Sequence, residues 1–283
     1  MNPIMMAMRA GLRRGGIEVR QTLTNPQDLW NYLFPNLAFL LVLFFMRDAT
    51  VPGTDFSLGA RTLPSVLGGG MAFGALTTMM MTLTVEREDG TLLRAKAIPN
   101  GMLGYLVGKV VQVAGMSLIG AAILVVPGSL LVDGVEVDGA RSWLTLAWVV
   151  PLGLFACLPL GAIFGSIFDN PRNIGIIMLP IMGLVATSGI FYPITTFPVW
   201  LQWVGQAFPI YWLGLGTRSA LLPDELAAVE IGGSWQHLET FGMLAGWALL
   251  GLVVAPIVLR RMARRESGSS VAARKEKAMQ RVT

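Results

Sequence analysis

The segment "VEREDGTLLRAKAIP" (residues 85–99) decides how this chain is organised, because it gathers charge in a sequence that has little of it. Only 13% of the 283 residues are Asp, Glu, Lys or Arg, and 54% are hydrophobic. Soluble domains carry roughly a quarter charged residues, so this composition predicts an integral membrane protein. The charged side chains of the segment are Glu86, Arg87, Glu88, Asp89, Arg94 and Lys96.

Long apolar stretches free of charge lie on both sides of this segment and recur along the chain. A helix needs roughly 20 apolar residues to cross a bilayer. One stretch, 173–217, is about two spans long. If it crosses once and folds back, the chain has six spans. The predicted spans are 29–46, 62–85, 110–132, 142–168, 174–192 and 240–259.

The distribution of charge sets the orientation and supports an even number of spans. Both ends of the chain are rich in arginine, and Lys and Arg concentrate in cytoplasmic loops. We therefore expect both termini and the loop 86–109 in the cytoplasm. Only four basic residues fall in the predicted outer loops: Arg47, Arg61, Arg141 and Arg218.

The long stretch 173–217 contains helix-breaking and interface-seeking residues. Pro193, Pro198 and Pro209 each remove a backbone donor and clash with the preceding turn. Trp200 and Trp203 are typical of the headgroup boundary. We predict a re-entrant or interfacial segment at 193–213 on the outer side, with two short helices within 197–213. Backbone of this kind is tolerated at membrane depth only where protein or a water-filled cavity covers it.

These features predict an all-α integral membrane protein in three parts. Residues 1–28 form a cytoplasmic amphipathic segment, and 29–259 form the six-span domain. Residues 260–283 form a basic cytoplasmic tail.

Several kinds of site have no counterpart in the sequence. There is no GxxxxGK[ST] motif, so we expect no ATP site of that type. The only histidine is His237 and the only cysteine is Cys157, which predicts no metal site, no disulfide and no catalytic residue. Ionisable residues are absent from the span centres, which disfavours a proton-driven carrier. Lys109 alone lies just inside one edge, where its side chain can reach the interface.

The charged segment itself predicts a short helix. Gly90 suits the end of the second span, and Pro99 ends the helical stretch 91–97 that follows. A short helix across the mouth of two spans suits docking into the groove of a partner. The alternative is a solvated loop that merely follows the charge rule, but this leaves the three acids at the membrane exit unexplained.

Two segments resemble the type-2 ABC exporter permeases, the family that includes the daunorubicin-resistance permeases. "EREDGTLLRAKAIP" is similar to the family pattern E-R-E-x-G-T-x-x-x-L-x-x-x-P, with Ala95 where leucine is common. "SGIFYPITTFPVWLQWVGQAFPIYW" is similar to the segment after the fifth span of that family. The matching residues are Glu86, Arg87, Glu88, Gly90, Thr91 and Pro99 in the first segment, and Gly189, Pro193, Pro198, Trp200, Leu201 and Pro209 in the second.

The resemblance implies that this chain is the membrane half of an exporter. Two such subunits would pair, most often as a homodimer, above two separate ATPase subunits that bind ATP and Mg. No cofactor on this chain and no nucleic-acid partner are implied. An amphipathic helix at about 17–28 would lie against the ATPase and the membrane surface. The residues implied in ATPase coupling are Glu86, Arg87, Glu88, Gly90, Thr91, Leu92, Leu93, Arg94 and Pro99.

The family also implies a substrate path at the dimer interface, between the second and fifth spans. Methionine adapts to irregular apolar shapes, although the methionines here could equally face lipid or the core. The path residues implied are Thr77, Thr78, Met81, Met182, Thr187 and Ser188, with an outer gate at Pro193, Pro198 and Trp200.

The sequence therefore predicts export of a hydrophobic or amphipathic, drug-like or antibiotic-like substrate across the cytoplasmic (inner) membrane, and hence a role in antibiotic resistance. Export of a lipid or a cell-envelope glycan is an alternative. A membrane scaffold without transport is a third possibility, from a different functional class.

Overall fold

The structure, a computed structural model, describes residues 2–49, 57–135, 139–167 and 174–265, and their regular elements are all helical. Five of the helices are long and apolar enough to cross a membrane, which confirms the predicted all-α membrane architecture. These are α2 (Pro26–Met46), α3 (Leu58–Glu88), α5 (Gly101–Leu131), α6 (Ala140–Ile167) and α10 (His237–Arg265).

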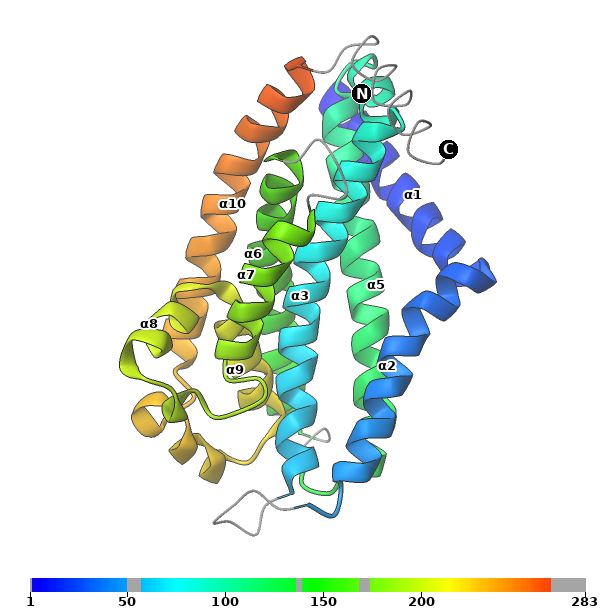
Figure 1. The fold of residues 1–283 in the computed structure, drawn as a ribbon. Coiled ribbons are helices and arrows are strands. Elements are labelled where there is room, and N and C mark those ends of the chain that lie inside the picture. Colours follow the sequence, from blue (N-terminus) through cyan, green and yellow to red (C-terminus); the bar gives the residue numbers. More distant parts are fainter. Residues whose placement is uncertain (1, 50–56, 136–138, 168–173, 266–283) are drawn as a thin grey trace.

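Helix α3 lies at the centre of the bundle, packed against α5, α6 and α9 (Pro209–Leu221) (Figure 1). Glycines allow this packing. A Cβ atom on Gly165 of α6 would lie 2.8 Å from the carbonyl oxygen of Met80, and one on Gly68 of α3 would lie 2.7 Å from that of Leu213. Small residues permit close backbone approach between membrane helices, where apolar burial offers little driving force.

The segment after α6 folds as one short helix and then a helical hairpin. Helix α7 (Ile174–Thr187) has 14 residues, or about 21 Å at 1.5 Å per residue, and is shorter than the other apolar helices. A turn with η2 (Ile194–Thr196) leads to α8 (Val199–Ala207) and α9. The two predicted short helices are therefore present, but α9 continues to Leu221 because all of its residues are buried in the bundle.

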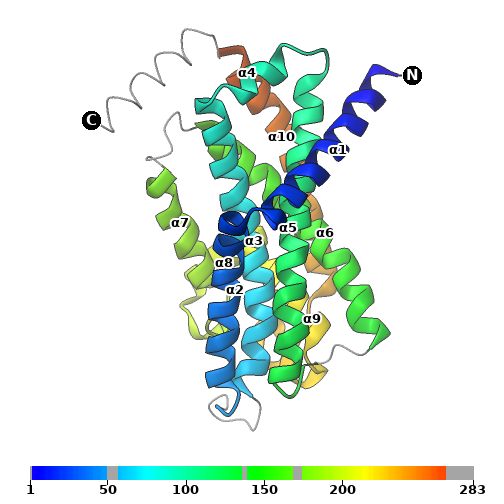
Figure 2. The same ribbon diagram turned by 90° about the vertical axis from the view of Figure 1, so that its right-hand side faces the viewer.

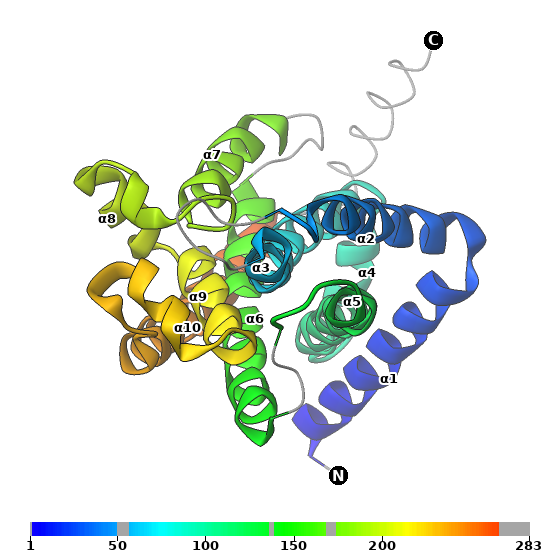
Figure 3. The same cartoon turned by 90° about the horizontal axis from the view of Figure 1, so that it is seen from below.

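The start of α1 (Pro3–Thr24), the short helix α4 (Thr91–Lys96) and the C-terminal end of α10 lie at the same end of the bundle (Figures 1 and 2). The end of α2, the start of α3, η3 (Asp224–Val229) and η4 (Ile231–Gly233) lie at the opposite end. Seen along the bundle, α1 and α2 flank α5 on one side of α3, and α7 and α8 lie on the other (Figure 3).

The N-terminal helix corrects one prediction. A helix was expected at about 17–28, but α1 ends at Thr24 and α2 begins at Pro26. Asn25 causes the break, because its side chain accepts a hydrogen bond from the Gln27 amide at 3.1 Å and so caps α2. Proline at the first helical position cannot continue the hydrogen bonds of α1. Within the predicted tail 260–283, α10 extends to Arg265, and 266–283 lie outside the described residues, as do 168–173.

Candidate functional site

Helix α4 crosses the ends of α3 and α5, as the charged segment predicts (Figure 2). Gly90 adopts a left-handed conformation with φ of 83°, and Asn100 does the same with φ of 54°. Asp89 fixes the start of the helix, because its Oδ1 accepts a hydrogen bond from the Thr91 amide at 2.8 Å. These turns stabilise a six-residue helix that would be only marginally stable as an isolated peptide.

The two faces of α4 differ. Leu92 and Ala95 are buried at 1% and 7% exposure against the bundle, so Leu92 stabilises this chain and is not an outward docking contact. Arg94 is exposed and donates a hydrogen bond to the Thr91 hydroxyl at 2.7 Å. Ile98 and Pro99 are also exposed, and Leu93 is half-buried. The outward surface at this end therefore combines a basic and an apolar group.

Glu86 faces inward, where it joins an inner charge cluster formed by Arg14, Glu18, Glu86 and Lys109. Lys109 Nζ lies 2.5 Å from Glu86 Oε1 and 2.6 Å from Glu18 Oε2. Arg14 Nε donates to Glu18 Oε1 at 2.7 Å, and its Nη2 lies 3.9 Å from Glu86 Oε1. The cluster ties α1, α3 and α5 together just below α4.

Lys109 corrects a prediction, because it does not reach toward the interface. Only 3% of its side chain is exposed. The cause is the crossing of α1 over α5, where Gly11 and Gly15 face Gly104 and Gly108. A Cβ on Gly15 would lie 2.7 Å from Cβ of Val111, so only glycine brings α1 close enough for Glu18 to meet Lys109.

The cluster balances two cations with two carboxylates. Burial alone would raise the pKa of Glu18, but hydrogen bonds from Lys109 and Arg14 outweigh it and hold that pKa below its usual value of 4.5. Burial likewise opposes the charge of Arg14, yet Glu18 and Glu86 raise its pKa. Sequence reasoning missed Arg14 and Glu18. Their i,i+4 spacing on a helix was an available signal.

The next two residues of the motif, Arg87 and Glu88, differ in their surroundings. Arg87 is buried at 8% exposure, and its Nη1 donates to the Ser166 carbonyl oxygen at 3.3 Å, which links α3 to α6. Glu88 is the last residue of α3, and its side chain lies outside the described part of the structure.

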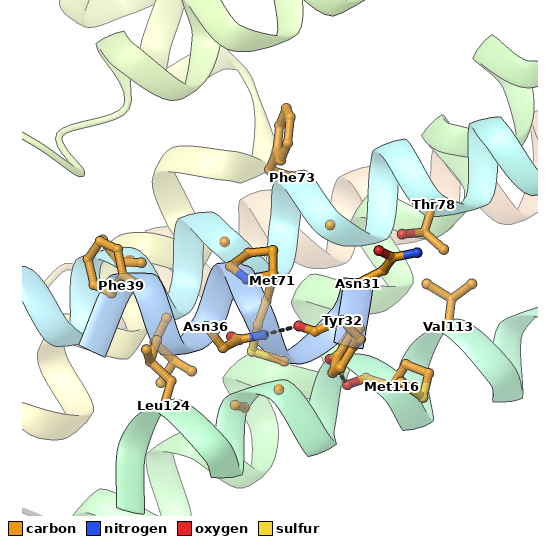
Figure 4. Close-up of a pocket in the computed structure, with 18 of the residues that line it drawn as sticks. Asn31, Tyr32, Asn36, Phe39, Met71, Phe73, Thr78, Val113, Met116 and Leu124 are labelled. Atoms are coloured by element: carbon orange, nitrogen blue, oxygen red, sulfur yellow. Dashed lines mark hydrogen bonds between the residues drawn. The ribbon is translucent and has the colours of Figure 1, made fainter. Parts of the chain in front are cut away.

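The predicted path residues do not converge within one chain. Met81 on α3 and Met182 on α7 are exposed at 49% and 58%. Thr77 is buried, and its hydroxyl donates to the Phe73 carbonyl oxygen at 2.8 Å. The hydroxyls of Thr187 and Ser188 likewise bond to carbonyls of their own helix, Gly183 and Val185. Thr78 alone lines a cavity, which lies between α2, α3 and α5 (Figure 4).

The predicted gate residues lie around the turn into α8. Pro193 precedes η2 and Pro198 is the N-cap of α8. Trp200 and Trp203 project from α8 with 63% and 70% exposure. Exposed tryptophans on a short helix are typical of a membrane interface.

An outer charge pair, Arg218 and Glu230, was not expected, since both were assigned to an outer loop. Arg218 Nε donates to Glu230 Oε1 at 2.8 Å, and the side chains are 1% and 2% exposed. Gly189, with φ of 75°, turns its carbonyl oxygen toward Arg218 Nη1 at 3.5 Å. Arg61, also expected in a loop, is buried in α3 at 7% exposure. Arg61 is buried because α3 begins at Leu58, before the predicted span 62–85, and Arg218 is buried because α9 continues to Leu221, past the predicted short helices at 197–213.

Comparison with known families gives one match. The model of a family described as "ABC-2 family transporter protein" matches residues 56–257. This region runs from just before α3 to near the end of α10. No curated protein matches the chain significantly. Among the described residues, no group of three or more His, Cys, Asp or Glu side chains could hold a metal ion.

Proposed function

The chain belongs to the ABC-2 family of transporter proteins, whose model covers more than half of it, and from this premise we propose that it is the permease subunit of an ABC exporter. The family is a membrane transport component and not itself catalytic. In our proposal, this daunorubicin-resistance-like permease moves a hydrophobic or amphipathic, drug-like or antibiotic-like substrate out of the cell. ATP hydrolysis takes place on a separate subunit.

The placement of α4 carries the proposal. A short helix held between two left-handed turns, with Arg94 and Ile98 exposed at the end of the bundle, has the shape and chemistry of a docking element. Two ATPase subunits, with their ATP and Mg, would bind beneath a homodimer of this chain. The exposed Met81 and Met182 would then face the second copy across the substrate path.

We further propose six crossings with both ends in the cytoplasm. The start of α1 and the end of α10 lie at the same end of the bundle, which supports an even number of crossings (Figure 1). Five helices are long enough, and in this proposal α7 makes the sixth crossing. Its 14 residues fall short of the roughly 30 Å hydrocarbon thickness, a mismatch that membranes accommodate by local thinning. The basic residues near both ends favour the cytoplasmic side of the cell membrane.

The contacts of Glu86 assign it a positioning role inside this chain. It holds Lys109 and, through Lys109, the N-terminal helix α1. The proposed ATPase contacts are instead Glu88, at the end of α3, together with Arg94 and Ile98.

The test compares Glu88→Ala and Arg94→Glu with Arg47→Glu, an exposed arginine that caps the C-terminal end of α2. Each variant is purified with the ABC ATPase that copurifies with the wild-type chain, and ATP hydrolysis is measured in proteoliposomes. We expect the first two variants to assemble in the membrane but to lose most of the stimulation of ATP hydrolysis. Arg47→Glu should behave as wild type. Full stimulation in Glu88→Ala and Arg94→Glu would exclude α4 as the coupling element.

A further inference from the structure

A cavity of about 440 Å³ lies between α2, α3 and α5 within this single chain (Figure 4). Small-molecule sites usually occupy about 300–1,000 Å³, so the cavity has room for one such molecule. On α3 its wall runs from Val66 to Thr78, which is about 18 Å at 1.5 Å per residue. The cavity differs from the path implied between two subunits in that α7 contributes nothing to its lining, although Thr78 belongs to both.

The two ends of the cavity differ in polarity. The labelled polar side chains Asn31, Tyr32 and Thr78 lie at one end, together with Val113 and Met116, whereas only the apolar Phe39 and Leu124 are labelled at the other (Figure 4). A ligand that fills the whole length would place a polar group at the first end and an apolar chain at the second.

Hydrogen-bonding groups remain available at the polar end. The side chains of Asn31 and Thr78 form no hydrogen bond within the described part of the chain, and both are exposed to the cavity. Pro35 has no N–H, so the carbonyl oxygen of Asn31 also lacks its usual helical donor. Two other polar lining residues are already bonded within the chain. Tyr32 donates to the Met116 carbonyl oxygen, and Gln112 accepts from Lys109 at 3.0 Å.

The cavity offers no charge to a ligand. None of its lining residues is Asp, Glu, Lys, Arg or His. Lys109, which donates to the lining residue Gln112, belongs to the inner charge cluster, whose two cations and two anions bind one another. Moving an unpaired charge into such an environment is costly. The site thus selects a ligand whose polar end bonds through hydroxyl or amide groups.

Helix α2 is the least buried of the three helices that enclose the cavity. In the apolar window of α2 only 11% of residues are buried, against 61% in α3. The outer face of α2, with Leu41 and Phe45, is exposed and apolar, as expected of a lipid-facing surface. A molecule dissolved in the bilayer can thus reach the cavity at the edge of α2.

We propose that this cavity is a binding site for an uncharged amphipathic molecule taken from the membrane. Asn31 and Thr78 hold its polar end, and Phe39, Leu67 and Leu124 surround its apolar chain. The inference concerns binding to the permease alone and stands whether or not ATP drives transport.

The probe is a monoacylglycerol with a photoactivatable diazirine on its acyl chain, and the fatty acid of the same chain serves as its charged counterpart. Purified full-length permease in lipid nanodiscs is labelled without ATP or ATPase, and adducts are mapped by mass spectrometry. The blocking variant is Gly74→Phe, because a Cβ at Gly74 meets no atom within 4 Å and the ring would fill the cavity. Its matched control is Gly242→Phe on α10, which is equally open but lies outside the cavity.

We expect adducts of the monoacylglycerol at Phe39, Met71 or Leu124, lost in Gly74→Phe and retained in Gly242→Phe. The small changes Asn31→Leu and Thr78→Val test the polar end even if Gly74→Phe does not fold. Each should weaken labelling by the monoacylglycerol about five-fold, the change in affinity expected from losing one hydrogen bond. Neither should strengthen labelling by the fatty acid. The proposal is overturned if labelling survives Gly74→Phe, if the adducts lie on the outer face of α2, or if the fatty acid labels the cavity equally well. None of these results depends on the ATPase, so they leave the proposed exporter function to its own test.

Discussion

The inner charge cluster and the outer charge pair bury charge in different ways. In the cluster, four side chains from three helices share their partners, and the carboxylates keep 15–16% of their surface exposed. The pair joins Arg218 and Glu230, 1% and 2% exposed, and neither has another salt-bridge partner among the described residues. Burying a charge costs free energy unless an opposite charge lies beside it. Where a buried charge has a single partner, no other group compensates when that partner is removed. The comparison indicates that the outer charge pair is needed to stabilise the fold itself. The inner charge cluster instead holds α1 on the bundle through several contacts, each of which can be lost separately.

The surroundings of the pair strengthen this contrast. Arg61, buried in α3, is close enough to interact electrostatically with both Arg218 and Glu230, and its Nη2 has no hydrogen-bond partner among the described residues. Glu230 is therefore the carboxylate that offsets two buried cations at this end. In the cluster, Arg14 lies beside both carboxylates and can partly replace Lys109.

The largest effect is expected from Glu230→Gln, which leaves Arg218 buried without its counter-charge. We expect a loss of about 3–5 kcal/mol, the usual cost of breaking a buried pair, measured as a fall in the thermal unfolding temperature of the purified protein in detergent. Asp224→Asn is the control, because it breaks the exposed bidentate pair with Arg141, worth about 0–1 kcal/mol. An equal fall in unfolding temperature in the two variants would show that burial does not determine how much the outer charge pair stabilises the protein.

A smaller effect is expected from Lys109→Met, since Arg14 stays next to both glutamates. Glu18 and Glu86 would then lose their shared partner, at a cost of about 1–3 kcal/mol. We expect α1 to separate from α5, seen as faster tryptic cleavage at Arg9 and Arg13. Lys96→Met on the exposed part of α4 should leave that rate unchanged. If cleavage is not accelerated in Lys109→Met, the cluster does not hold α1.

The smallest effect concerns pH. Because the pKa of Glu18 is lowered in the folded protein, its contribution is complete above the unfolded value of 4.5 and is lost as the pH falls through the folded value. We expect cleavage of α1 by pepsin, a protease that is active in acid, to accelerate below about pH 4.5 in the wild type. Glu18→Gln, which costs about 1 kcal/mol at neutral pH, should remove most of this acid response. An unchanged acid response in Glu18→Gln would show that Glu18 is not the group responsible for it.

The sequence predicts those helices that are marked by residues within or directly beside them. Charge-free runs of sufficient length marked five long helices, and Gly90 and Pro99 marked α4, because a left-handed turn and a missing donor act on adjacent residues. Contacts between distant helices could not be read in this way. Glu86 lies in a charged run that looks outward-facing, and only the glycine crossing of α1 over α5 turns it toward Lys109. Likewise, hydropathy does not show that α9 is enclosed on all sides, so the burial of Arg218 was missed.

The central claim, that α4 docks an ATPase, is tested most directly by crosslinking from Ile98. The only native cysteine, Cys157, is buried, so Ile98→Cys adds one accessible thiol at this end of the bundle. Leu238→Cys, at a position 81% exposed in the first turn of α10, far along that helix from its C-terminal end near α4, is the matched control. A thiol-reactive photo-crosslinker on Ile98→Cys in native membranes should capture an ABC ATPase, identified by mass spectrometry through its Walker motifs, with a yield that changes on adding ATP. Capture of that ATPase from Leu238→Cys but not from Ile98→Cys, or from neither, would contradict the account.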